Sequence, residues 1–130
     1  MNKILVDTSI WIEYFKGSKK AVPDILNPLI DNNQICTNDL ILSELIPSLK
    51  VKKETELIEI LLTIQNIPIK INWQEIIKYQ TVNLKNGINN VGIPDIIILQ
   101  NVINNSLSLL TIDKHFKLMK KYIEFDLIEI

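Results

Sequence analysis

The chain has 130 residues, 47% of them hydrophobic, and a formal net charge of −1 at pH 7, which together fit a globular protein. This length predicts one domain over residues 1–130, and no apolar stretch approaches the roughly 18 residues that a membrane-spanning helix needs. A single cysteine and a single histidine exclude an internal disulfide framework and argue against a zinc site, and the charge provides no global basic field for nucleic acid.

Strands alternate with helices along the chain. Short apolar runs rich in β-branched residues predict the strands, and apolar residues at helical spacing predict the helices. We expect strands at residues 4–6, 34–37, 67–71, 108–112 and 125–130. We expect helices between residues 8 and 17 and at about 22–30, 39–49, 54–65, 73–85, 94–104 and 114–121. This order predicts an α/β fold in three α/β/α layers, with a mainly parallel sheet of about five short strands.

The N-terminal segment has the pattern of a strand followed by a helix rather than that of a signal peptide. Asp7 and Glu13 interrupt the apolar run that a signal sequence needs, so we expect a cytoplasmic protein. Thr8 or Ser9 is expected to cap the helix, and Gly17 is expected to end it.

Prolines and capping residues set further boundaries. Pro47 lies inside an otherwise helical pattern and is expected to kink or shorten that helix. Pro68 indicates that its strand lies at a sheet edge or begins there. Asn72 and Glu75 match a capping box, in which Asn72 caps the helix and Glu75 reaches back to it. Pro94 fits the first position of the next helix.

Four carboxylates lie at the ends of apolar runs, at the expected edge of the core. Asp7 and Asp113 each end a predicted strand. Glu44 lies one to two turns into a helix that follows a strand, and Asp95 lies in the first turn of another helix. Sites in such sheets form at the carboxyl ends of the strands, near a change in strand order. Four ionised acids would repel one another there unless a cation neutralised them, and oxygen ligands suit Mg²⁺ or Mn²⁺.

Each of these acids also has a purely structural interpretation. Asp7 can cap a helix, as can Asp113. Glu44 can be an exposed helix residue, and Asp95 can be a favourable charge at a helix N-terminus. His115 is interpreted as a structural or solvent-facing helix residue rather than as a catalytic base. The functional interpretation rests on all four acids occurring together, not on any one of them.

Four motifs carry a resemblance to a known family. They are ILVDTSIWI at residues 4–12, TNDLILSEL at 37–45, GIPDIII at 92–98 and LTIDKHF at 110–116. In this order and spacing they resemble the motifs of PIN domains, and more narrowly those of VapC-type toxins from bacterial or archaeal toxin–antitoxin pairs. The resemblance extends over nearly the whole chain and implies a PIN-like fold.

The resemblance implies an endoribonuclease that uses Mg²⁺ or Mn²⁺ to hydrolyse RNA. It also implies a homodimer that a cognate antitoxin protein holds inactive. By position, the catalytic quartet of the family corresponds to Asp7, Glu44, Asp95 and Asp113. Asp7 and Asp95 are expected to bind the metal directly, with Asp113 as a third ligand or a partner through water. Ser9 and Thr111 resemble the polar residues that support the quartet.

Two features depart from the usual family pattern. Residues 96–99, with the sequence IIIL, replace the small alanines that usually follow the third acid, which makes that helix bulkier. After the fourth acid come Lys114 and His115 rather than a further acid. Neither departure removes a member of the quartet.

Two other classes of protein are compatible with parts of this pattern. A phospho-acceptor domain of the receiver type has a similar length and an acidic pocket. It needs paired acids after the first strand and an aspartate after the third, whereas Asp7 stands alone and residues 67–71 are followed by none. A non-catalytic module that binds RNA or protein on a nuclease-like fold is the second class. Four retained acids argue against that second class, because binding alone does not need them.

Overall fold

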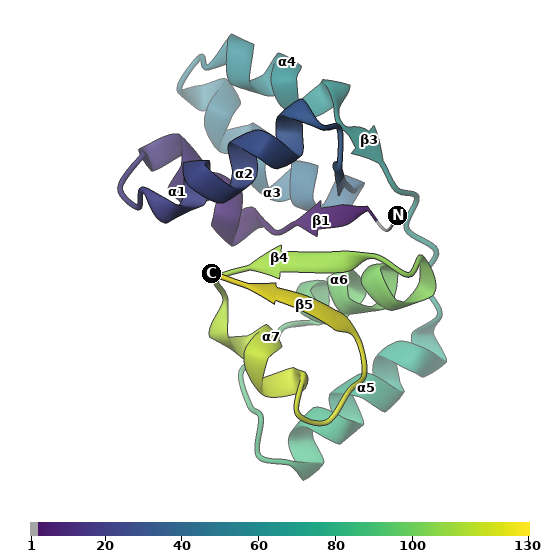
Figure 1. Ribbon diagram of the computed structural model, residues 1–130. Helices are drawn as coiled ribbons and strands as arrows, with labels where there is room; N and C mark the ends of the chain where they lie inside the picture. The colour runs from purple at the N-terminus through teal and green to yellow at the C-terminus, as the bar shows by residue number, and fades with distance from the viewer. Residues whose placement is uncertain (1–2) are drawn as a thin grey trace.

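A five-stranded parallel sheet forms the centre of the computed structural model, which describes residues 3–130 (Figure 1). The strands are β1 (Ile4–Val6), β2 (Ile35–Thr37), β3 (Gln65–Asn66), β4 (Ser108–Thr111) and β5 (Asp126–Glu129). Their order across the sheet is β3-β2-β1-β4-β5, and every neighbouring pair is parallel. The predicted α/β fold with a parallel sheet of about five strands is therefore confirmed.

Seven helices connect and flank these strands. They are α1 (Thr8–Lys16), α2 (Ala21–Asp31), α3 (Asp39–Val51), α4 (Thr55–Thr63), α5 (Trp73–Lys85), α6 (Ile93–Asn104) and α7 (Lys114–Met119). In Figure 1, α1 to α4 gather above β1, whereas α5 and α7 lie below β4 and β5. Within residues 3–130 no helix combines the length and the apolar character needed to cross a bilayer.

The inner strands consist almost entirely of buried residues. All of β2 and β4 is buried, and so are Leu5 and Val6 of β1. Burial of consecutive residues requires cover on both faces of the sheet, which explains why apolar and polar residues do not alternate along these strands. Trp11 of α1 and Phe116 of α7 are the bulkiest of the fully buried side chains, so a helix from each half of the chain contributes to one core.

The third strand differs from its prediction. Residues 67–71 form no strand; β3 is Gln65–Asn66, at the edge of the sheet, and α4 correspondingly ends at Thr63. The N–H of Ile67 still donates to the carbonyl of Thr37, at 2.8 Å. Pro68 follows and has no N–H with which to continue the ladder. Pro68 therefore lies beyond the strand rather than within it, and the edge position predicted for that strand is confirmed.

Of the two effects expected of Pro47, shortening of its helix is wrong, because α3 continues to Val51; the kink stays a prediction. The prolyl ring removes one backbone donor, but Pro47 is exposed, so water can hydrate the carbonyl left without a partner. At the start of α1, neither Thr8 nor Ser9 is the cap, because Asp7 occupies the N-cap position and its side chain makes no capping bond. The C-terminal prediction for α1 is confirmed by Gly17, which has φ 68° and donates to the carbonyl of Glu13.

Half of the predicted capping box is present at α5. The Asn72 side chain accepts from the N–H of Glu75 at 3.2 Å. The Glu75 carboxylate does not reach back, because it accepts instead from Gln100 Nε2 on α6, at 2.8 Å. Gln100 takes over the second half of the motif: its Oε1 accepts from the N–H of Asn72 at 3.2 Å. Gln100 on α6 has thus replaced Glu75 as the partner of the Asn72 N–H, and these two bonds connect α5 to α6.

Asn38 caps α3 from inside the core, and its replacement by alanine is expected to lower the free energy of unfolding by about 1–3 kcal/mol. The side chain is 0% exposed; its Oδ1 accepts from the N–H of Ile41 at 2.9 Å, and its Nδ2 donates to Asn101 Oδ1 at 3.0 Å. Asn72→Ala, which removes an equivalent but exposed cap, is the matched control and should cost less. Urea denaturation measures both, and equal losses would contradict the importance of burial.

Candidate active site

The candidate site lies where the strand order reverses. The chain builds β1, β2 and β3 on one side of the sheet and then returns to place β4 and β5 on the other side of β1 (Figure 1). The carboxyl ends of β1 and β4 are therefore neighbours, and the N–H of Asp7 donates to the carbonyl of Leu110 at 3.0 Å. Ligand sites in open parallel sheets form at such a switch point. The fold thus brings Asp7 and the residues after β4 to one edge.

Asp7 is buried, only 5% exposed, and is held by two hydroxyl groups. Its Oδ2 accepts from Ser9 Oγ at 2.7 Å and from Thr111 Oγ1 at 2.8 Å. The backbone N–H of Ile112 donates to Ser9 Oγ, and that of Asp113 donates to Thr111 Oγ1. In the part of the chain that the structure describes, both bonds to the carboxylate go to Oδ2. The hydroxyls thereby fix the carboxylate while leaving Oδ1 able to bind a ligand.

Asp113 lies two residues beyond β4 and serves as the N-cap of α7. Its Oδ1 accepts from the N–H of His115 at 2.9 Å, so the capping interpretation of this acid is correct as far as it goes. The same oxygen lies 3.2 Å from Nδ1 of the His115 ring. One potential ligand atom from each of Asp95, Asp113 and His115 lies within 4.8 Å of the others. The Asp113 carboxylate therefore both caps α7 and belongs to this group of potential metal ligands.

Asp95 is the acid whose ionisation the structure disturbs most clearly. It lies in the first turn of α6, behind Pro94, and its pKa is raised from 3.8 to about 6. Burial is the largest cause, and repulsion by Asp113, Asp7 and Glu44 adds to it, in that order. His115 acts in the opposite direction. All three other acids of the predicted quartet thus lie close enough to act on Asp95.

Glu44 stands at the periphery of this group. It projects from α3, is exposed, and its Oε1 accepts from Thr8 Oγ1 at 2.9 Å. Neither Glu44 nor Asp7 belongs to the three-residue cluster of Asp95, Asp113 and His115. The structure therefore brings the quartet to one edge of the sheet, with ligand atoms of Asp95 and Asp113 within 4.8 Å of each other and with Glu44, of the three other acids, having the weakest effect on Asp95.

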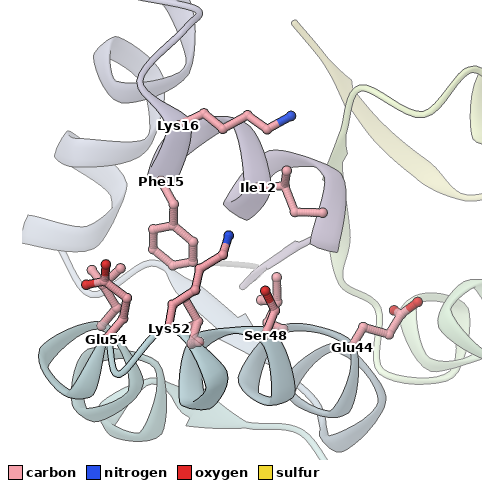
Figure 2. Close-up of a pocket in the computed structure, with 10 residues that line it drawn as sticks. Ile12, Phe15, Lys16, Glu44, Ser48, Lys52 and Glu54 are labelled. Carbon is pink, nitrogen blue, oxygen red and sulfur yellow. The ribbon is translucent and has the colours of Figure 1, made fainter.

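A cavity of about 460 Å³ opens beside Glu44, between α1, α3 and the start of α4 (Figure 2). Its wall is largely apolar, with Ile12 and Phe15 from α1. In Figure 2 the side chains of Lys16 and Lys52 extend over this wall from opposite sides, and Glu44 lies at the far end. The cavity and the acidic edge thus share one residue but have different chemistry.

A divalent cation fits the donors at this edge. Carboxylate oxygens are the ligands that Mg²⁺ and Mn²⁺ prefer, and the mutual repulsion that raises the pKa of Asp95 is what a bound cation would relieve. Sequence reasoning assigned no site role to His115. Its position two residues after a predicted acid, at a predicted helix start, was the available signal, because it places the imidazole over that acid.

Comparisons with known proteins agree with this architecture. The structure is similar to VapBC2 from Rickettsia felis bound to a promoter DNA fragment, with a TM-score of 0.76, 18% identity and 98% of each chain covered. It is also similar to DNA-bound VapBC from Salmonella typhimurium (TM-score 0.70, 16% identity, 99% of this chain and 98% of that one). A third similar structure is FitAcB from Neisseria gonorrhoeae (TM-score 0.71, 16% identity, 96% of each chain).

These identities are low, so the structural matches show a shared fold. None of the curated proteins matches the sequence. The family model of the PIN domain matches residues 4–122, which is most of the chain and includes all four acids. The chain therefore belongs to the PIN domain family.

Proposed function

We propose that this protein is a metal-dependent endoribonuclease and the toxin of a VapBC-type toxin–antitoxin pair, acting in the cytoplasm. The observation that carries the nuclease part is the acidic edge itself, where burial and then repulsion by Asp113, Asp7 and Glu44 raise the pKa of Asp95. Ionised acids grouped in this way lower the stability of the fold unless a cation neutralises them, and with a cation bound they form a site for catalysis. Membership of the PIN domain family, whose members are generally metal-dependent nucleases, supports the same function.

Within this proposal, each residue has a distinct task. A bound Mg²⁺ or Mn²⁺ would lower the pKa of a water molecule and neutralise the phosphate. Asp7, Asp95 and Asp113 would hold the cation.

Three further residues have roles that do not include binding the cation. Ser9 and Thr111 keep Asp7 in one orientation through their bonds to Oδ2. Glu44, which is exposed and accepts from Thr8 through Oε1, is assigned the role of orienting the attacking water or accepting its proton.

The proposed partners are an RNA substrate, a cognate antitoxin and a second copy of the chain. Several similar structures are VapBC assemblies, and another is a toxin–antitoxin complex from Klebsiella pneumoniae. Two apolar side chains are available for contact with a second copy, since Ile60 is exposed and Ile46 is half-buried. Leu49, on the same helix as Ile46, is buried in the core and is not available.

The test is an RNA cleavage assay with the purified protein. Total transfer RNA and structured RNA are incubated with wild type in Mg²⁺, in Mn²⁺ and in chelator. Discrete fragments that disappear on chelation are expected. Asp24→Asn is the matched control, because it removes an exposed acid of α2 and should leave cleavage unchanged.

Two outcomes of this assay would contradict the proposal in different ways. No cleavage together with no metal-dependent rise in Tm would favour a binding module. Stabilisation by metal without cleavage would retain the metal site and reject the tested RNAs as substrates. The receiver alternative has lost its support, because β3 carries no aspartate and the family match is to a PIN domain.

A further inference from the structure

We propose that His115 is a direct nitrogen ligand of the divalent cation, beside Asp113 and Asp95, and that this ligand makes the site select Mn²⁺ over Mg²⁺. The inference rests on the metal-dependent function proposed above and adds a residue to it. The carboxylate quartet alone would accept either cation, because both bind oxygen ligands.

The position of the ring is fixed from the backbone. Asp113 is the N-cap of α7, and its Oδ1 accepts from the N–H of His115 at 2.9 Å, which holds the first turn of the helix against the carboxylate. The ring nitrogen Nδ1 then lies 3.2 Å from the same oxygen. Adjacent ligands in an octahedral shell, each about 2.1 Å from the cation, lie about 3 Å apart. The observed separation therefore matches two neighbouring ligands of one ion.

A purely structural role for the ring is poorly supported. Phe116 and Met119 pack α7 into the core and are fully buried, whereas the His115 side chain is 37% exposed. In the described residues, 3–130, the Asp113 carboxylate is the single polar contact of the imidazole. The ring therefore neither fills the core nor satisfies a buried polar group. What it does is supply a nitrogen atom to the only three-residue group of potential metal ligands that these residues contain.

The choice of cation follows from ligand chemistry. Imidazole nitrogen binds first-row transition ions, whereas Mg²⁺ prefers carboxylate, carbonyl and water oxygens. Replacing one oxygen ligand by imidazole therefore gains affinity for Mn²⁺ and gains little for Mg²⁺. The other role open to His115 is to orient Asp113 without touching the cation. That role would improve binding of both ions alike and would leave no bond between metal and nitrogen.

The deciding experiment uses the untagged full chain, in which His115 is the sole histidine. Mn²⁺ is bound to the protein, and pulsed electron paramagnetic resonance measures the coupling of the ion to imidazole nitrogen. Because the chain has no other imidazole, any such coupling must come from His115. We expect the coupling in wild type, its loss in His115→Gln, and its retention in Lys114→Gln, the matched control at the neighbouring exposed position.

Calorimetric titrations provide the second readout. His115→Gln is expected to weaken Mn²⁺ binding by about tenfold or more and Mg²⁺ binding by less than about twofold. Mn²⁺ binding without nitrogen coupling in wild type would overturn the inference and leave the proposed nuclease site intact. Equal losses for both ions would also overturn it. Absence of Mn²⁺ binding would reject this inference and the proposed metal site together. The wild-type spectrum decides even if the variant does not fold.

Discussion

Asp7→Asn is expected to lower the rate of RNA cleavage on the order of a thousandfold while leaving the fold intact. The amide keeps the volume of the buried side chain, and its oxygen can still accept from Ser9 and Thr111, as Oδ2 of Asp7 does. What changes is the other atom, which becomes an NH₂ group that cannot bind a cation. Loss of several kcal/mol of metal-derived stabilisation corresponds to about three powers of ten in rate. Single-turnover cleavage with excess enzyme measures this loss directly.

Thr111→Val separates the metal-binding role of Asp7 from its support. It retains the carboxylate and the approximate volume of the side chain but removes one hydroxyl donor to Oδ2. Because Thr111→Val removes a residue that orients a metal ligand and not the ligand itself, we expect the rate of RNA cleavage to decrease by about 10- to 100-fold. This decrease is smaller than that expected for Asp7→Asn. Urea denaturation of both variants in chelator checks that the fold persists. Cleavage by Asp7→Asn at the wild-type rate would remove Asp7 from the site.

The sheet could be predicted from the sequence because burial leaves a clear local signal. Residues 108–111, for example, are all buried in β4, and four of the six residues from 107 to 112 are apolar. The acids that follow such runs must then lie at one edge of a parallel sheet, which is why Asp7 and Asp113 were predictable as neighbours. What the pattern could not predict was how close each acid comes to the others. The packing of α3 sets the distance between Glu44 and the other acids, and it leaves Glu44 at the periphery.

The two errors in helix capping share one cause, which is that a tertiary partner replaced the local one. Ser9 looks like a helix cap in sequence, but the hydroxyl of Thr111 lies 3.2 Å away and both residues bind the same carboxylate. Glu75 fits a capping box, yet Gln100, 25 residues later, takes its carboxylate. Cap motifs describe bonds between near neighbours in sequence, and they carry no information about a competing side chain from another element.

Asp95→Asn is expected to stabilise the metal-free protein at pH 7.5 and to leave its stability unchanged near pH 4. The pKa of Asp95 is raised from 3.8 to about 6 in the folded state. Between these values the folded protein holds a proton that the unfolded chain releases, so the stability of the wild type falls as pH rises from about 4 through 6. Above that range the full cost of the ionised carboxylate is present. It should be on the order of 1 kcal/mol, since solvent screens a partly exposed group.

Adding Mg²⁺ or Mn²⁺ is expected to reverse the order of the two proteins. The cation neutralises the repulsion among Asp95, Asp113 and Asp7, so the wild type gains stability with the logarithm of the metal concentration above Kd. Asp95→Asn lacks the ligand and gains little. Urea denaturation at pH 4 and 7.5, with metal and with chelator, measures all eight free energies of unfolding. If Asp95→Asn were the less stable protein at pH 7.5 in chelator, the carboxylate would be stabilising the fold. Ionised acids at this edge would then need no cation, and the physical argument for the metal site would fail.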